Sequence, residues 1–510
     1  MTRTAPRWIA ALAALAVAGI VLTGCVPSAS RTSPTSTPTG ETVSAQLQPF
    51  YDQSITWTSC GGGMQCAKAK APLDYRDPAT GEVELALVRH PATGERIGSL
   101  LVNPGGPGGS GYGFVKDSLD YAVDKKLQEH YDIVGFDPRG VARSDGVTCL
   151  DASAMDHYLY DIPSGTRGSD QWIAEQDATA KTFAAACNAK TGPLLDNVDT
   201  ESAARDLDVL RAALGDKKLS YLGYSYGTFL GATYAGLFPD KAGRMVLDGA
   251  LDPATNNFDV TKEQAKGFES ALRAYLADCL GDSSSCPFSG SVDGAMQTIS
   301  KLLASVEANP IRGGDGRMLG ANTLTTAIIY PLYSEEGWPA LSKMFDSVLA
   351  GDADTAFYYA DQYNGRQDDG TYKDDSTEAF MAVNCMDYSY DDDPTAMRAQ
   401  ATELAAAAPV IGPYFGYGDI ACANWPYTTR AERTEIHAKG APPILVVGTT
   451  NDPATPYVWA QALAKQLDSG VLVTYKGEGH TAYNKSNSCV NNAVDTFLLT
   501  GKPPASDPKC

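Results

Sequence analysis

One serine of the sequence stands in a pattern that suits a nucleophile. Ser225 lies in the pentapeptide GYSYG, which begins at Gly223 and ends at Gly227. A β-prone run, residues 219–224, precedes the serine, and a segment of helical character follows it. A strand-to-helix turn of this kind holds the serine hydroxyl above a sheet, and its glycines are needed because neighbouring backbones approach closely. The pattern predicts a nucleophile elbow with Ser225 as the attacking group.

A serine hydroxyl needs a base to take its proton, and the base needs an acid to orient it. His480, one of five histidines, follows the last predicted strand in the sequence GEGHTAY. Asp452 follows the strand before that one, in GTTNDPATPY. The order serine, aspartate, histidine, each at a strand end, is typical of serine hydrolases on parallel sheets. We predict that these residues form a catalytic triad with Ser225. Asp248 and Asp252, which follow the strand after the elbow, are alternative acids.

A glycine-rich stretch supplies the donors that such chemistry requires. The sequence NPGGPGGSG begins at Asn103, directly after a short apolar strand. A tetrahedral intermediate needs two N–H donors for its oxyanion. The backbone N–H of Tyr226 is one candidate, and an N–H at Gly105 or Gly106 is the second.

The same stretch also fits a dinucleotide-binding pattern. Its glycines at positions 106, 108 and 111 spell GxGxxG after a strand, and Asp137 ends the next strand. Pro104 and Pro107 count against this alternative because they remove N–H donors and disfavour an immediate helix start. An exported chain also has little access to nicotinamide cofactors. We therefore expect no cofactor.

The elements that position these residues can be read along the chain. Seven runs have the composition of strands, and they are residues 83–90, 99–102, 131–137, 219–224, 244–249, 443–448 and 471–475. A helix is expected over residues 200–214, with Thr200 as its cap. Between residues 253 and 435 the alternation of strands and helices lapses. The pattern predicts an α/β fold, a mostly parallel central sheet with helices on both faces and an inserted, largely helical cap.

The chain begins with an export signal. Arg3 and Arg7 precede an apolar run, residues 8–22, which is short for a bilayer span and ends in LTGC. The last four residues resemble a bacterial lipoprotein signal, in which Cys25 becomes the lipidated first residue. An ordinary secretory signal is the alternative. The lipoprotein would sit on the outer face of the cell membrane, held through this anchor alone and partly released to the medium.

Composition and spacing divide the rest of the chain. Residues 26–42 are mostly Ser, Thr, Pro, Ala and Gly, which cannot form a core and favour a flexible tether. The predicted divisions are a signal peptide at 1–25, a tether at 26–45, a first core part at 46–252, a cap at 253–435 and a second core part at 436–510.

The cysteines and the charge agree with export. Beyond Cys25 there are ten cysteines, which suggests five disulfides, with sequential pairing as the simplest arrangement. They are Cys60, Cys66, Cys149, Cys187, Cys279, Cys286, Cys385, Cys422, Cys489 and Cys510. No CxxC pair or HxxxH spacing favours the alternative of a zinc site, so we expect no metal. The net charge of -21 argues against nucleic acid as a partner.

Five motifs together resemble a known family. They are GYSYG at Gly223, NPGGPGGSG at Asn103, GFDPRG at Gly135, GTTNDPATPY at Gly448 and GEGH at Gly477. From about residue 55 to its end, the chain resembles the secreted tripeptidyl aminopeptidases, α/β hydrolases related to the proline iminopeptidases. The resemblance implies the α/β-hydrolase fold and serine exopeptidases that remove short peptides from free amino termini, some of them lipoproteins. It makes Ser225 the nucleophile, Asp452 the acid and His480 the base.

Relatives recognise the substrate's amino terminus with carboxylates near the cap. Here the cap offers Asp387, beside Cys385 in NCMDY, and Glu335 and Glu336 in SEEGW. Solvated acids or helix caps are the alternative roles for each of them. We expect a monomeric exopeptidase that acts on peptides and releases tripeptides. A carboxylesterase or lipase with the same triad, and a non-catalytic surface binding protein on this scaffold, are the alternatives.

Overall fold

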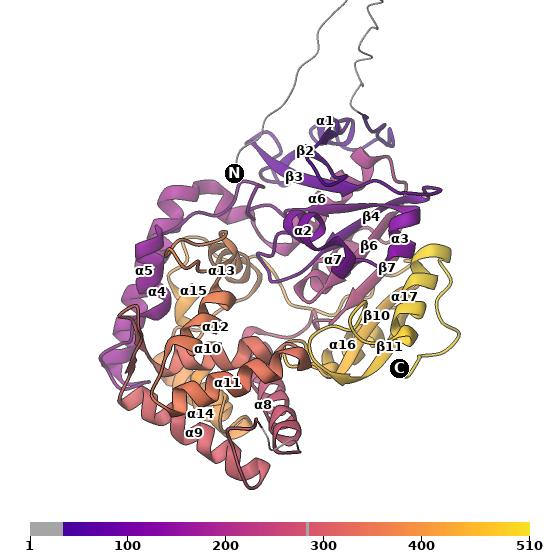
Figure 1. Ribbon diagram of the computed structural model, residues 1–510. Helices are drawn as coiled ribbons and strands as arrows, with labels where there is room; N and C mark the ends of the chain where they lie inside the picture. The colour runs from indigo at the N-terminus through magenta and orange to yellow at the C-terminus, as the bar shows by residue number, and fades with distance from the viewer. Residues whose placement is uncertain (1–33, 282–284) are drawn as a thin grey trace, which may run out of the picture.

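The computed structural model describes residues 34–281 and 285–510, and its centre is one twisted sheet (Figure 1). Among the described residues nine strands form this sheet in the order β1-β2-β3-β5-β4-β6-β7-β10-β11. The strands are β1 (Thr58–Ser59), β2 (Gln65–Pro72), β3 (Glu82–His90), β4 (Gly98–Asn103), β5 (Tyr131–Phe136), β6 (Leu219–Tyr224), β7 (Ala242–Asp248), β10 (Ile444–Asn451) and β11 (Gly470–Glu478). From β5 to β11 all pairings are parallel, whereas β1, β2 and β3 pair antiparallel. The predicted mostly parallel sheet is confirmed.

Helices cover both faces of the sheet because its strands are apolar on both sides. Leu100 and Val102 of β4 point into the core beneath α2 (Gly111–Ala122), α3 (Lys125–His130) and α17 (Ser488–Thr500). Leu101, between them, points into the opposite core. That core is covered by α6 (Thr200–Leu214), α7 (Tyr226–Leu237) and α16 (Tyr457–Gln466). The small helix α1 (Gln48–Tyr51) packs on α6.

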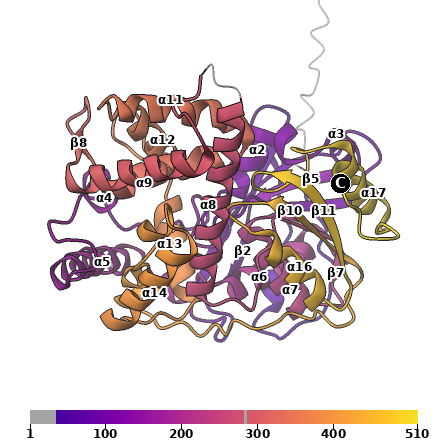
Figure 2. The ribbon, with the colours of Figure 1, turned by 90° about the horizontal axis from the view of Figure 1, so that it is seen from below.

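A largely helical cap stands beside the carboxyl ends of the strands and has its own apolar core (Figure 2). Its helices are α8 (Asn257–Gly281), α9 (Val292–Ala308), α10 (Ala321–Leu332), α11 (Trp338–Leu349), α12 (Asp354–Asn364), α13 (Ser376–Asp387), α14 (Pro394–Ala407) and α15 (Ile420–Ala423). Short 3-10 turns, η2 (Glu335–Gly337) and η3 (Gly412–Tyr414), and a hairpin of β8 (Ile311–Arg312) and β9 (Met318–Leu319) complete it.

A segment of the predicted first core part also packs against the cap. Helices α4 (Ala152–Tyr160) and α5 (Asp170–Thr191) lie beside the cap helices α13 and α15 (Figure 1). Phe183 of α5 and Leu195 of the turn η1 (Gly192–Asn197) also belong to the core that contains Leu101 of the sheet. Trp172 of α5 shares a buried cluster with Met397 of α14. Part of this segment therefore packs on the cap although it precedes the predicted boundary at residue 253, and its apolar partners there lie far away in sequence.

The described part of the predicted tether is attached to the core. Thr35 pairs with Thr56, and the Ser36 hydroxyl donates to the carbonyl of Ala213 at 2.6 Å. Glu41 forms an ion pair with the buried Arg211. Residues 34–45 are thus held to the domain by backbone hydrogen bonds and one carboxylate, and Val43 packs against the cluster of α1 and α6. The signal peptide and Cys25 lie outside the described residues, and no helix in the described ranges is long and apolar enough to cross a membrane.

Five disulfides link the ten cysteines in sequence order. The pairs are Cys60–Cys66, Cys149–Cys187, Cys279–Cys286, Cys385–Cys422 and Cys489–Cys510. Bridges of this number are typical of proteins that fold in an oxidising compartment, and they leave no thiolate for the zinc alternative.

The last bridge holds the carboxyl-terminal tail on strand β11. The Cys510 N–H donates to the Thr474 carbonyl at 2.7 Å, and the Thr474 N–H donates to the Pro508 carbonyl at 2.9 Å. The tail therefore pairs with the exposed side of an edge strand.

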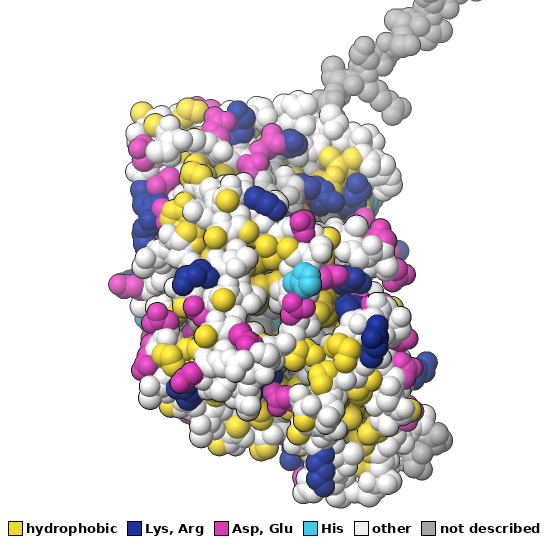
Figure 3. All heavy atoms as spheres, turned by 90° about the vertical axis from the view of Figure 1, so that its left-hand side faces the viewer, with side chains coloured by type: hydrophobic (Ala, Val, Ile, Leu, Met, Phe, Trp, Pro, Cys, Tyr) yellow, Lys and Arg dark blue, Asp and Glu magenta, His cyan; other side chains and the backbone are white. Residues whose placement is uncertain are grey.

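On the face shown in Figure 3, acidic, basic and apolar side chains are interspersed without an extended area of one charge.

Candidate active site

Ser225 lies on a sharp turn between β6 and α7. Its backbone angles, φ 55° and ψ −125°, are unusual for a residue with a side chain. Its N–H donates to the Asp248 carbonyl at 2.9 Å, and the Thr228 hydroxyl donates to its carbonyl at 2.6 Å. A Cβ at Gly223 would lie 2.3 Å from the carbonyl oxygen of Gly227, so no larger residue fits there. This arrangement is a nucleophile elbow.

The predicted oxyanion donors lie next to the elbow. Tyr226 is the first residue of α7, so its N–H has no acceptor within the helix. A Cβ on Gly105 would lie 2.9 Å from that nitrogen, which places the glycine-rich loop directly against it. The Gly105 N–H is already occupied, because it donates to Asn103 Oδ1 at 2.9 Å. The Gly106 N–H makes no hydrogen bond within the described ranges, and Gly106 borders the same cavity as Ser225. Of the two predicted glycines, the geometry thus favours Gly106.

Asp452 and His480 meet at the ends of β10 and β11. His480 Nδ1 lies 2.9 Å and 3.0 Å from the two carboxylate oxygens of Asp452. Asp452 is buried and also accepts hydrogen bonds from the N–H groups of Ala454, Thr455 and Thr481 at 2.8 to 3.0 Å. These donors stabilise its negative charge away from water. The carboxylate can therefore hold the imidazole with its Nε2 free to act as a base.

Two further contacts of the histidine were not predicted from the sequence. The Thr455 hydroxyl donates to Asp452 Oδ2 at 2.9 Å and lies 3.2 Å from His480 Nδ1. Thr455 also borders the cavity of Ser225, so it connects the two halves of the site. From the cap side, the Tyr333 carbonyl accepts a hydrogen bond from the backbone N–H of His480 at 2.8 Å. The tyrosine and imidazole rings also meet edge to face, with their centres 5.4 Å apart. Of these two contacts, only that of Thr455 has a signal in the sequence, because a hydroxyl three residues after Asp452, in ATPY, could orient the acid.

The alternative acids have other partners. Asp248 is fully buried and accepts hydrogen bonds from the N–H groups of Ala482 and Tyr483, at 3.0 Å and 2.7 Å. It therefore fixes the loop that carries His480 without touching the imidazole. Burial raises the pKa of Asp248 to about 6, although the two backbone donors act in the opposite direction. Asp252 accepts instead from the Gln466 side chain at 2.7 Å.

The dinucleotide alternative does not fit the structure. A Cβ on Gly108 would lie 2.6 Å from the Ser376 carbonyl of the cap, so this glycine is needed for packing. Asp137 is fully buried and accepts from the Ser110 hydroxyl at 2.5 Å and the Tyr112 N–H at 3.1 Å. Its carboxylate is consequently turned to the start of α2 and cannot bind a ribose.

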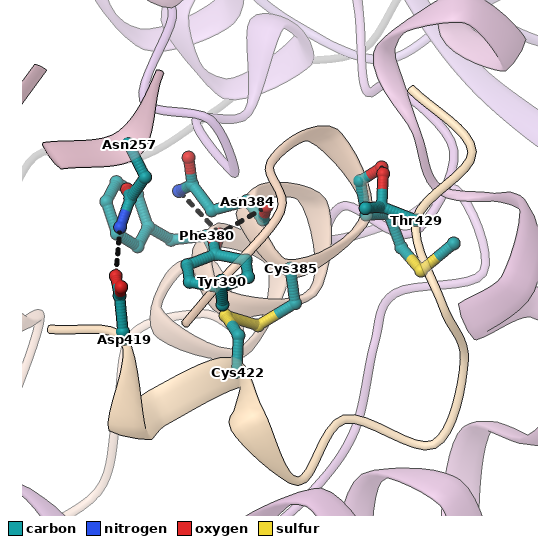
Figure 4. Close-up of a disulfide and its surroundings, with 9 residues drawn as sticks. Asn257, Phe380, Asn384, Cys385, Tyr390, Asp419, Cys422 and Thr429 are labelled. Atoms are coloured by element: carbon teal, nitrogen blue, oxygen red, sulfur yellow. Dashed lines mark hydrogen bonds between the residues drawn. A yellow bond between two sulfur atoms is a disulfide. The ribbon is translucent and has the colours of Figure 1, made fainter. Parts of the chain in front are cut away.

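A cavity of about 320 Å³ separates Ser225 from the cap. Its floor includes Gly106, Tyr226 and Phe229, and its cap side includes residues of α8, α13 and α15. Figure 4 shows that the Cys385–Cys422 disulfide joins α13 to α15 at this wall, beside Asn384. On the same wall the Asn257 amide donates to Asp419 at 2.7 Å (Figure 4). A disulfide and a hydrogen bond therefore both hold this wall of the cavity together.

Asp387 borders this cavity at the end of α13. Its two oxygens accept from the N–H and the hydroxyl of Thr200, at 2.8 Å and 2.5 Å. The Thr200 hydroxyl also lies 2.5 Å from the Tyr226 hydroxyl. Burial raises the pKa of Asp387 to about 7, against the effect of the Thr200 donors. Thr200 is thus not the cap of α6, which is Asp199, and it links Asp387 to the elbow instead.

Glu335 and Glu336 lie apart from Asp387. Both are exposed residues of η2 and border a second cavity of about 320 Å³, which His480 borders from the other side. Ser225 borders the first cavity, and His480 borders the second. The three acidic residues predicted to bind an amino terminus therefore belong to two different subsites.

Comparison with known proteins agrees with this geometry. The family profile described as alpha/beta hydrolase fold matches residues 98–287, and the profile described as TAP-like protein matches residues 408–510. The chain is 32% identical to the tripeptidyl aminopeptidase of Streptomyces lividans over 89% of this chain and 86% of that protein. The protein belongs to this family of α/β-hydrolase serine peptidases. It is a serine hydrolase of that family, and its elbow and acid–histidine pair occupy the strand ends that the fold requires.

Other relatives of this α/β-hydrolase peptidase carry different names. The serine protease Hip1 of Mycobacterium tuberculosis is 34% identical over 99% of this chain and 98% of that protein. Carboxylesterase B of the same organism is 35% identical over 91% of each chain. Similarity to these three relatives supports the fold and the serine hydrolase chemistry. Because their names differ, the acyl substrate has to be inferred from the site itself.

Proposed function

We propose that the protein is an exported serine exopeptidase that releases short peptides, chiefly tripeptides, from free amino termini. The carrying observation is the position of Asp387, a buried carboxyl on the cap side of a cavity that begins at Ser225. A cavity of about 320 Å³ lies at the small end of the range for ligand sites, which suits a short peptide. A carboxylate at its far side would attract a protonated amine and select chain ends.

In the proposed reaction Ser225 attacks the peptide carbonyl while His480 takes the hydroxyl proton. Asp452 holds the resulting imidazolium, and the N–H groups of Tyr226 and Gly106 bind the oxyanion. The C–N bond then breaks, and His480 returns the proton to the leaving nitrogen. Water, activated by the same histidine, attacks the acyl-enzyme, and the short peptide leaves with a new carboxylate.

The proposed setting is the outer face of the cell membrane. The lipoprotein signal ending at Cys25 would supply the anchor, and the five disulfides suit an oxidising compartment outside the cytoplasm. The proposed partners are peptides, with no nucleic acid, and the proposed enzyme is a monomer.

A comparison of three substrates tests the proposal. We would measure kcat/KM on a fluorogenic tripeptide amide with a free amino terminus, on its acetylated counterpart and on a short-chain ester. The kcat/KM for the free-amine peptide should be about 100-fold higher than that for the acetylated peptide, as expected for the attraction of an ammonium to a poorly solvated carboxylate. Ser225→Ala should lose activity on all three by on the order of 10⁶-fold. Equal rates on the acetylated peptide would refute recognition of the amino terminus.

A carboxylesterase is the second candidate. Phe229, Leu251 and Met381 give the Ser225 cavity an apolar lining, which would also accept an acyl chain. Turnover of the ester alone, with neither peptide cleaved, would establish this candidate in place of the first.

A further inference from the structure

The two cavities of the site lie on either side of the bond that would be cleaved. Ser225 borders the first cavity together with the oxyanion donors, so the acyl part of a substrate belongs there. His480 borders the second cavity, and it gives its proton to the leaving nitrogen. The leaving chain must therefore start beside the imidazole and continue into the second cavity.

A row of five tyrosines leads from this cavity onto the outside of the cap. We call Tyr330, Tyr333, Tyr358, Tyr359 and Tyr363 the tyrosine row. Its first ring, Tyr333, meets the His480 ring at 5.4 Å and borders the second cavity. The following ring pairs are 6.4 Å (Tyr333–Tyr363), 6.4 Å (Tyr330–Tyr363), 6.3 Å (Tyr330–Tyr359) and 5.2 Å (Tyr358–Tyr359) apart. The row is thus continuous from His480 to Tyr358, in the middle of α12.

Much of this aromatic surface is open to solvent. Tyr358 is 53% exposed, Tyr363 is 48% exposed and Tyr330 is 38% exposed. These three belong to a short group of large apolar or aromatic side chains that the described residues leave exposed. Contiguous exposed aromatic side chains mark binding surfaces more often than scattered ones do.

We propose that the tyrosine row binds the polypeptide segment that follows the scissile bond, and this inference rests on the proposed exopeptidase function. The continuity of the row with His480 identifies the occupant, because the only part of a substrate that reaches this side of the imidazole is the leaving chain. Tyrosine rings offer flat apolar faces with polar rims, which suit extended and proline-containing peptides. Glu335 and Glu336, exposed beside the cavity, add a preference for basic side chains.

The spacing of the rings determines how many residues of the leaving chain can contact the tyrosine row and so contribute to binding. An extended residue spans about 3.3 Å, so each step between rings covers about two residues. Because the row folds back between α10 and α12, we expect roughly four to six residues after the scissile bond to contribute. A longer tail should add nothing.

The test uses two substrates that share one free-amine tripeptide. The first continues with a single alanine amide, and the second with a six-residue tail of proline, leucine and arginine. Tripeptide release by the full-length enzyme is followed by mass spectrometry. The wild-type enzyme should cleave the tailed substrate with a kcat/KM about tenfold higher, mainly through a lower KM. Tyr358→Ala with Tyr359→Ala should remove this advantage, as the loss of two aromatic contacts predicts.

Two features of the design separate the outcomes. Cleavage of the single-residue substrate should be unchanged in the double variant, because neither tyrosine touches the triad. Leu349→Ala, at a 44% exposed position of α11, is the control and should keep the wild-type preference. Cleavage of both substrates with equal kcat/KM, or an unchanged preference in the double variant, would overturn the tyrosine-row inference alone. If neither substrate releases a tripeptide, the proposed exopeptidase function fails as well.

Discussion

Replacing Asp248 by asparagine should make the enzyme more stable and slower at the same time. In the folded protein this carboxyl is fully buried and accepts hydrogen bonds from the Ala482 and Tyr483 N–H groups, which fix the loop after His480. Other charged groups that act on it are Lys485, which favours its ionised form, and Asp452, which disfavours that form. Asparagine keeps one acceptor oxygen but places an NH₂ group against the other backbone donor.

The stability effect follows from the shifted pKa. Burial raises the pKa of Asp248 from 3.8 to about 6. Between these values the folded protein binds more protons than the unfolded chain, so stability falls as pH rises through this interval. Ionisation of this group thus costs about 3 kcal/mol of folding free energy at pH 8 and under about 1 kcal/mol at pH 4. Asp248→Asn removes the titration, and its gain in stability should be large at pH 8 and small at pH 4.

The activity effect has the opposite sign. Losing a charge-assisted hydrogen bond to the histidine loop, worth about 1.5 kcal/mol, should lower kcat about tenfold at pH 8. Urea unfolding with the disulfides intact, at pH 4 and pH 8, gives the stability difference, and steady-state kinetics give kcat. Asp252→Asn is the control, since Asp252 lies on the same segment without contact to that loop. A stability difference that is the same at both pH values would refute the reasoning.

Three further changes test other parts of the site. Thr455→Val removes a hydroxyl that donates to Asp452, so kcat/KM should fall about 10- to 100-fold, while circular dichroism shows an unchanged fold. Asp387 has a pKa near 7, so the ratio of kcat/KM for free-amine over acetylated peptide should rise between pH 6 and pH 8 as its carboxyl ionises; in Asp387→Asn this ratio should be low and flat, and a surviving rise would assign recognition to another group. Replacing Cys385 and Cys422 by serine should lower the free energy of unfolding by about 2 to 4 kcal/mol in urea titrations, and a stability equal to wild type would show that the hydrogen bonds of the wall suffice.

The residues proposed as the triad can be predicted from the sequence because each follows a strand, and the carboxyl ends of parallel strands meet at one edge. Thr455 could be suspected only from its closeness to Asp452. The partner of Asp387 could not be found in this way. Thr200 lies 187 positions earlier in the sequence, and the two residues meet only through the packing of the cap on the start of α6.

Two contacts of the fold that local sequence patterns do not predict have a common physical cause. The first half of helix α5 packs through Trp172 against cap residues more than 200 positions later in the sequence. Residues 34–45 have the composition of a linker, but hydrogen bonds from the backbone need no apolar side chains. Local patterns fix which elements form, whereas the partners of an element depend on the whole chain.

The tail that Cys489–Cys510 holds against β11 has a consequence beyond the fold of one molecule. An open edge strand presents unpaired N–H and C=O groups, to which a strand of another molecule can add. At the opposite border β1 is only two residues long and offers little to pair with. At β11 the contacts of Pro508 and Cys510 occupy the N–H and the carbonyl of Thr474, in the middle of the strand. The Cys489–Cys510 bond, by holding the tail there, therefore also interrupts the edge to which another molecule could add a strand, and reduction of this bond should favour aggregation.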